Sequence, residues 1–190
     1  MTTRRSFLIG SASLAASGLL TKTIRAQDTT PPPPGVSAAP PKPPALPPEK
    51  VQATVAQSHR NLAAVRALVE ETPLLVNACW DQGGGDFETP LQAAAHTGRR
   101  AIAEYLLSQN ARLDLYAAGM LGHLDFVRAA LGTDVITAAA VPGPHGFTLL
   151  HCARVGGESA KPVYDWLIAQ GVPTVFQRPL PFVWPANATP

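Results

Sequence analysis

The sequence predicts an all-α solenoid of about four helix-turn-helix repeats, joined by short or missing β-hairpins. Three observations lead to this fold class. Apolar residues recur at the helical spacing of 3.6 between residues 49 and 175. Several of these apolar stretches end at glycine or asparagine, the residues that best adopt the left-handed conformation of a helix stop. One pattern of capping threonine, leucine and turn glycine also returns along the chain, and such self-similarity is the signature of repeat proteins.

The first 26 residues have the layout of an export signal. Arg4 and Arg5 precede an apolar stretch over residues 7–20, and Ala26 stands before the predicted cleavage point. Paired arginines are typical of the twin-arginine route, which carries folded proteins across a bacterial membrane. About 14 apolar or small residues are too few for a membrane span. We therefore expect a periplasmic or otherwise exported protein, with an uncleaved signal that tethers it to the membrane as the alternative.

Removal of this segment changes the charge of the chain. Its basic residues are Arg4, Arg5, Lys22 and Arg25, and taking these four from 15 leaves 11 Lys and Arg beside 13 Asp and Glu. The mature chain is therefore slightly acidic, and it has no basic patch with interleaved aromatic residues. These features argue against nucleic acid as a partner.

A proline-rich segment separates the signal from the repeats. Residues 31–48 hold ten of the 20 prolines. Proline fixes φ and lacks an amide hydrogen, so such a stretch joins neither a helix nor the interior of a sheet. We expect a disordered linker at residues 27–48, extended and semi-rigid, ahead of a repeat domain at residues 49–175. An irregular Pro-rich tail is expected at residues 176–190.

The clearest repeat begins at Thr89, in the stretch TPLQAAAHTGRRAIAEYLLSQNA. Thr89 is placed to cap a first helix, with Pro90 at the first helical position and Gln92 completing a capping box. Gly98 is placed to end this helix, and Asn110 to end a second one. The second helix has an apolar stripe of Ile102, Ala103, Tyr105, Leu106 and Leu107.

The same pattern recurs on both sides of this repeat. A fourth repeat begins at GFTLLHCARVGG, and a third is predicted in LDLYAAGMLGHLDFVRAAL, with Gly122 as its turn glycine. Gly122 follows Gly98 by only 24 residues, where about 33 is usual, so the hairpin between repeats two and three should be largely missing. Upstream, NLAAVRALVEETPLLVNA predicts the second helix of a first repeat, after an inner helix at about residues 50–57.

These repeats resemble ankyrin repeats, which combine a Thr-Pro-Leu start, small residues, a turn glycine and a second apolar helix. The first repeat lacks the Thr-Pro-Leu start, as a capping repeat can, and the third carries Leu113 and Asp114 instead. The resemblance implies a protein–protein interaction module that binds with its hairpin tips and inner helices. It also implies that His151 makes a structural hydrogen bond in its turn.

The titratable residues predict no chemistry of their own. The histidines, cysteines and carboxylates show no pair at zinc spacing, so we expect no metal site and no cofactor. His59 and His123 are expected to lie in turns between helices. No nucleophile elbow or other catalytic set is present, and we expect no catalytic residue and no enzyme activity. Cys79 and Cys152 fall in distant repeats and should stay free thiols.

The loop CWDQGGGDFETP, between repeats one and two, is the main candidate for recognition. Its three glycines permit the positive φ angles of a long β-hairpin, and its aromatic and acidic residues suit a binding hot spot. Alternatively its aromatic residues cover the repeat junction, Trp80 and Phe87 above all. The predicted contact residues are Trp80, Asp81, Asp86, Phe87, Glu88, Gln92, His96, Tyr116 and Met120, with His145 and Phe147 at the next tip.

The sequence thus predicts an exported, monomeric module that binds an unidentified protein partner and has no stable membrane span after signal cleavage. Two alternatives stay open. One is a groove on the concave face that binds a small ligand or catalyses a reaction, which convergent histidines and carboxylates would favour. The other is an inert domain tethered in the cell envelope, which the lack of an exposed aromatic patch would favour.

Overall fold

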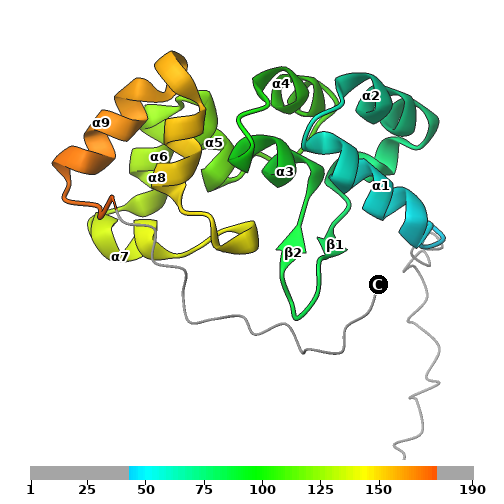
Figure 1. The fold of residues 1–190 in the computed structure, drawn as a ribbon, viewed down its shortest axis with the longest axis horizontal. Coiled ribbons are helices and arrows are strands. Elements are labelled where there is room, and N and C mark those ends of the chain that lie inside the picture. The colour runs from blue at the N-terminus through cyan, green and yellow to red at the C-terminus, as the bar shows by residue number, and fades with distance from the viewer. Residues whose placement is uncertain (1–42, 175–190) are drawn as a thin grey trace, which may run out of the picture. The chain divides into compact units, whose positions relative to one another are not determined.

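The computed structural model describes residues 43–174. Arg4, Arg5 and Ala26, the linker as far as residue 42 and the tail from residue 175 lie outside the described residues, so the expectations placed on them stay predictions. Between residues 43 and 174, helical hairpins follow one another in chain order (Figure 1). None of the helices in this range is long and apolar enough to cross a membrane.

The first repeat consists of α1 (Pro48–Ser58) and α2 (Leu62–Glu71). α1 begins two residues before the predicted start, because proline is well tolerated in the first turn of a helix. A short 3-10 helix (Pro73–Asn77) then leads into a two-stranded antiparallel hairpin of β1 (Trp80–Asp81) and β2 (Phe87–Glu88). We name residues 80–88 the finger. Its presence confirms the hairpin predicted for the glycine-rich loop.

The second repeat, α3 (Pro90–His96) and α4 (Arg100–Ser108), forms as its sequence predicts. The Gln92 N–H donates to the Thr89 hydroxyl oxygen at 3.2 Å, and the Thr89 N–H donates to Oε1 of Gln92 at 2.9 Å. These two bonds are the capping box. Asn110 follows α4 with a φ of 67°, the left-handed stop that asparagine tolerates.

The third repeat consists of α5 (Leu115–Leu121) and α6 (Leu124–Leu131). Asp114 caps α5 by accepting a hydrogen bond from the Ala117 N–H at 2.8 Å. Gly122 makes the turn with a φ of 84°, and a Cβ atom there would lie 2.0 Å from the carbonyl oxygen of Ser159. Within residues 43–174 no strand lies between α4 and α5, which confirms the missing hairpin.

The fourth repeat consists of α8 (Leu149–Val155) and α9 (Lys161–Ala169). α7 (Val135–Ala140) and a short 3-10 helix (Pro144–Gly146) precede it, and another 3-10 helix (Gly157–Ala160) joins its two α-helices. This last segment accommodates the residues by which the fourth repeat exceeds the second.

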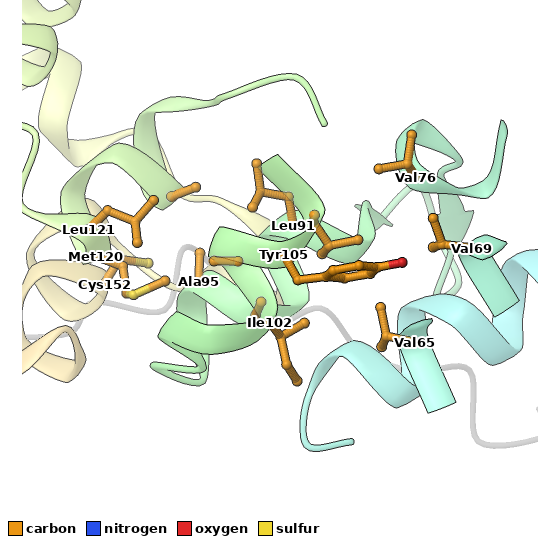
Figure 2. Packing of buried hydrophobic residues seen from close by; sticks show 14 residues of the cluster. Val65, Val69, Val76, Leu91, Ala95, Ile102, Tyr105, Met120, Leu121 and Cys152 are labelled. Atoms are coloured by element: carbon orange, nitrogen blue, oxygen red, sulfur yellow. The ribbon is translucent and has the colours of Figure 1, made fainter. Parts of the chain in front are cut away.

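An apolar core runs through the repeats. Figure 2 shows part of it, from Val65 and Val69 of α2, past Leu91 of α3, to Met120 of α5 and Cys152 of α8. Neighbouring repeats share these contacts, as the stacking of a solenoid requires.

Both cysteines are free thiols, as predicted. Cys79 is exposed at the start of the finger, whereas Cys152 is buried in α8. Burial, with a smaller contribution from Asp114, raises the pKa of Cys152 to about 12. The Cys152 thiol is therefore a core group that stays protonated.

Candidate functional site

Three histidines from separate segments of the domain meet around the carboxylate of Glu88. His59 follows α1, Glu88 lies on β2, His96 ends α3, and His145 lies in the turn before α8. One nitrogen or oxygen atom from each side chain can be chosen so that all four lie within 4.8 Å of one another. We name these four residues the histidine–glutamate cluster.

Each histidine directs its Nε2 atom at Glu88. The Nε2 atoms of His96 and His59 lie 2.8 Å and 3.5 Å from Oε1 of Glu88. The Nε2 atom of His145 lies 3.2 Å from Oε2, to which the side-chain amide of Gln82 donates at 2.8 Å. Glu88 is 0% exposed. Both oxygens of a fully buried carboxylate are thus surrounded by nitrogen atoms.

Two of the three rings are oriented through their other nitrogen atom. Nδ1 of His59 lies 3.0 Å from the carbonyl oxygen of Val55, which only accepts, so this Nδ1 carries the proton. Nδ1 of His145 lies 2.8 Å from Oδ2 of Asp86, and the His145 N–H donates to Oδ1 of the same carboxylate at 3.0 Å. In the neutral form of either ring, the Nε2 atom then carries no proton, and its lone pair faces Glu88.

The ionisation of Glu88 depends on this surrounding. Burial alone raises the pKa of Glu88. The hydrogen bond from His96, the charge of His59, the hydrogen bond from Gln82 and the charge of His145 outweigh burial and hold the pKa below its ordinary value. A buried carboxylate of this kind needs positive charge close by, from a protonated imidazole or from a bound cation.

The strand register of the finger decides which of its side chains reach the cluster. Trp80 pairs with Glu88, and Asp81 pairs with Phe87. Because side chains alternate across a strand, the two pairs point to opposite faces. Trp80 and Glu88 face the repeats, where Trp80 packs on buried Val51 and Leu75 and their neighbours, while Asp81 and Phe87 are exposed.

Backbone turns fix the finger and the loop that meets it. Gly83, Gly84 and Gly85 all have positive φ, and Oδ1 of Asp81 accepts hydrogen bonds from the Gly83 and Gly85 N–H groups. His145 has a φ of 57°, a left-handed conformation that is uncommon outside glycine. Its contacts with the finger hold it in that conformation.

Aromatic stacking extends the cluster to α8. The Phe147 ring stacks on His96, with centroids 4.7 Å apart, and on His151, with centroids 4.4 Å apart. Nε2 of His151 donates to the carbonyl oxygen of His96 at 2.9 Å, so its hydrogen bond links repeat four to repeat two instead of lying within its own turn, as the ankyrin resemblance implied. Burial lowers the pKa of His151 below its ordinary value, which keeps this ring neutral.

The predicted contact residues divide between surface and interior. Phe87 is 60% exposed, so the expectation that it covers the junction is wrong, whereas Trp80 covers it in part. Met120 and Glu88 are fully buried, and their prediction as contact residues is wrong. Met120 lies in the apolar core because small residues bring α3 close to α5.

Several of the remaining predicted contact residues make structural bonds, and one of them, His96, is buried. Gln92 completes the capping box, and the Tyr116 hydroxyl donates to the carbonyl oxygen of Val141 at 2.9 Å. Asp86 and His145 bind each other, and His96 is almost fully buried beside Glu88.

Reasoning from the sequence missed the cluster because its members are not close in the chain. The expectation of no metal site rested on ligand spacing along the sequence, and it stays a prediction. Spacing carries no signal here, since His59, Glu88 and His145 come from three different junctions or turns. Convergent histidines and carboxylates are the feature that favours a ligand-binding role.

Comparison with known families identifies the second repeat. Residues 86–116 match the family model of the ankyrin repeat. No curated protein matches the chain significantly. The matched segment begins in the finger, covers α3 and α4 and ends in α5, and hairpins of the same build precede and follow it. Ankyrin repeats are in general protein–protein interaction modules. The matched repeat, together with the helical hairpins on either side of it, makes residues 43–174 an all-α ankyrin-repeat solenoid.

Proposed function

We propose that the protein is an exported interaction module without catalytic activity, and that it binds another protein through the tip of the finger. The exposed ring of Phe87 carries this proposal. Phe87 lies in the same strand as buried Glu88, yet 60% of it is exposed. Asp81 and Asp86 flank it. An aromatic ring beside charged groups has the composition of an interface hot spot.

The tip is preorganised for such a contact. Asp81 holds the glycine turn through two N–H groups, and Asp86 is bound to His145 of the loop before α8. A surface that is already ordered loses little conformational entropy when a partner binds, which leaves more of the interaction energy as affinity.

The burial of Glu88 supports the proposed lack of catalytic activity. Glu88 is completely buried and each of its oxygens already has a nitrogen neighbour. A catalytic acid or base must reach the atoms of a substrate within hydrogen-bonding distance. The fully buried carboxylate of Glu88 does not meet this requirement.

Co-purification with two matched variants tests the proposed contact. The chain, tagged after Pro190, is expressed in its own host and recovered from the exported fraction. Phe87→Ala is compared with Phe126→Ala, which removes a phenyl ring that is 40% exposed on α6. We expect the wild type and Phe126→Ala to retain a protein that Phe87→Ala loses, with equal circular dichroism in all three.

Recovery of the same proteins by all three chains would place the contact elsewhere. Recovery of none, from folded protein, would favour the inert tethered domain.

Export is tested separately at the signal. Replacing Arg4 and Arg5 together by lysine should leave uncleaved precursor in the cytoplasm, because the twin-arginine route requires the arginine pair. Cell fractionation and immunoblotting measure the distribution. Unchanged export of the double variant would contradict this route.

A further inference from the structure

We propose that the histidine–glutamate cluster is a binding site for a divalent transition metal ion, with Zn²⁺ as the ion that suits it best. The ligands are the Nε2 atoms of His59, His96 and His145 and one carboxylate oxygen of Glu88. Three imidazoles and a carboxylate are ligands of the type that Zn²⁺ takes in proteins.

The direction of the hydrogen bonds supports a metal ion. Metal-binding histidines usually donate their other ring N–H to a carbonyl or a carboxylate, which leaves the lone pair of the binding nitrogen free. His59 donates from Nδ1 to the Val55 carbonyl, and His145 donates from Nδ1 to Asp86. In both neutral rings the Nε2 lone pair faces Glu88, an arrangement that is repulsive unless a proton or a cation lies between them.

The spacing of the ligand atoms fits a small tetrahedral ion. Metal–nitrogen bonds of about 2.0–2.1 Å hold tetrahedral ligands roughly 3.3 Å apart. The three Nε2 atoms lie 2.8, 3.2 and 3.5 Å from the nearer oxygen of Glu88. One ligand atom can be chosen from each of the four side chains so that all four lie within 4.8 Å of one another. The three nitrogen–oxygen separations lie on both sides of the tetrahedral value.

Charge and access also agree with a divalent ion. The carboxylates of Glu88 and Asp86 bring two negative charges to a cluster whose centre is buried, and a divalent ion balances both. The side chains of His59 and His145 are 27% and 31% exposed. Two of the three ligand rings are therefore partly accessible to solvent.

The bound ion connects parts of the domain that are distant in sequence. It joins the turn after α1, the finger, the end of α3 and the loop before α8. Four protein ligands complete a tetrahedral shell, which is the arrangement of a structural zinc site and leaves no open position for a substrate. The ion holds the base of the finger in place.

Direct titration tests the site. The full chain is purified through a histidine-free tag, stripped with EDTA and titrated with Zn²⁺ by calorimetry. A second sample receives Co²⁺, whose visible spectrum distinguishes tetrahedral from octahedral coordination. We expect one ion per chain, an intense tetrahedral Co²⁺ spectrum, and a melting temperature that rises with Zn²⁺ because only the folded chain holds the ligands together.

Variants assign the ligands. His59→Ala and His145→Ala should abolish the tetrahedral spectrum and the stoichiometric binding. Asp86→Asn, which changes only the partner of His145, should weaken Zn²⁺ binding by about 10–100-fold. His123→Ala is the matched control for His59→Ala, because His123 is exposed in the equivalent turn of repeat three; it should bind Zn²⁺ as the wild type does.

Three results would overturn the proposal: no stoichiometric Zn²⁺ or Co²⁺ binding to the folded wild type, an octahedral Co²⁺ spectrum, or equal loss in His123→Ala and His59→Ala. If circular dichroism shows that a ligand variant does not fold, Asp86→Asn and the wild-type Co²⁺ spectrum still test the proposal, because both proteins keep all four ligands. Absence of binding would mean that Glu88 is stabilised by its side-chain neighbours His96 and Gln82 without a metal ion.

Discussion

The junction between repeats one and two differs sharply from the junction between repeats two and three. The first has the finger, with its strand pair and the histidine–glutamate cluster at its base. The second passes from α4 to α5 without a strand. At this second junction the side chain of Asn77 bonds to the connecting segment. It donates to the carbonyl oxygen of Asn110 at 3.0 Å and accepts from the Arg112 N–H at 2.8 Å.

This difference explains how repeat two comes to contact repeat four. In a regular solenoid each repeat touches only its neighbours. Here repeat three lacks a hairpin, and the finger of repeat two meets His145 through Asp86 and Glu88. α3 also contacts α8 directly. The domain therefore contains both a repeat without a hairpin and a contact between repeats that are not adjacent.

The largest expected effect is at α4, which lies between the two junctions. Leu106 is fully buried in the core that both share. Leu106→Ala should lower the free energy of unfolding by about 2–5 kcal/mol, the usual cost of a large-to-small change in a core. Urea unfolding followed by circular dichroism measures it. A loss below about 0.5 kcal/mol would be typical of a surface site and would place Leu106 outside the core.

The second prediction concerns the junction between repeats two and three, which has no hairpin. Asn77→Ala removes two hydrogen bonds to residues 110 and 112 and should cost about 1–2 kcal/mol. Asn77→Asp is the matched variant, since it keeps the acceptor for the Arg112 N–H and loses the donor. Its unfolding free energy should fall between those of the wild type and Asn77→Ala. Equal stability of all three would mean that the Asn77 bonds do not support this junction.

The third prediction concerns the base of the finger. Thr89→Ala removes the hydroxyl of the capping box at the start of α3 and should cost about 1 kcal/mol. Thr89→Ser keeps the hydroxyl and should retain most of the stability. Thermal unfolding of both variants measures the difference, and equal losses in the two would show that the methyl group, not the hydrogen bond, matters.

The smallest effect is expected at the cap of α5. Burial raises the pKa of Asp114 above its ordinary value, in spite of the hydrogen bonds from Ala117 and Tyr116. A raised pKa in the folded state means that this carboxyl stabilises the fold in acid and that the contribution is lost as pH rises through the folded pKa. Asp114→Asn keeps the cap and should therefore be slightly more stable than the wild type at neutral pH.

The increase in unfolding free energy from Asp114→Asn should be smaller than the stabilisation that a helix cap contributes, which is about 1 kcal/mol. This increase should vanish at a pH below the ordinary Asp pKa of 3.8. Chemical unfolding at neutral and at acidic pH measures both. A gain that persists in acid would show that the charge of Asp114 is not its cause.

The fold could be predicted from the sequence wherever local signals were enough. The capping box at Thr89 and the left-handed stop at Asn110 depend only on residues a few positions away. The short spacing between Gly98 and Gly122 predicted the missing hairpin for the same reason. Prediction failed for Met120, because whether a helix residue faces the core depends on which helix packs against it.

The sequence by itself determined the repeat pattern, the helix caps, the turn glycines and the existence of the finger. Only the tertiary structure decided which face of the finger is buried, and that His59, His96 and His145 converge on Glu88. The physical reason is distance along the chain. Caps and turns depend on neighbouring residues, whereas the meeting of His59 and His145 depends on how intervening repeats pack and on the hairpin that repeat three lacks.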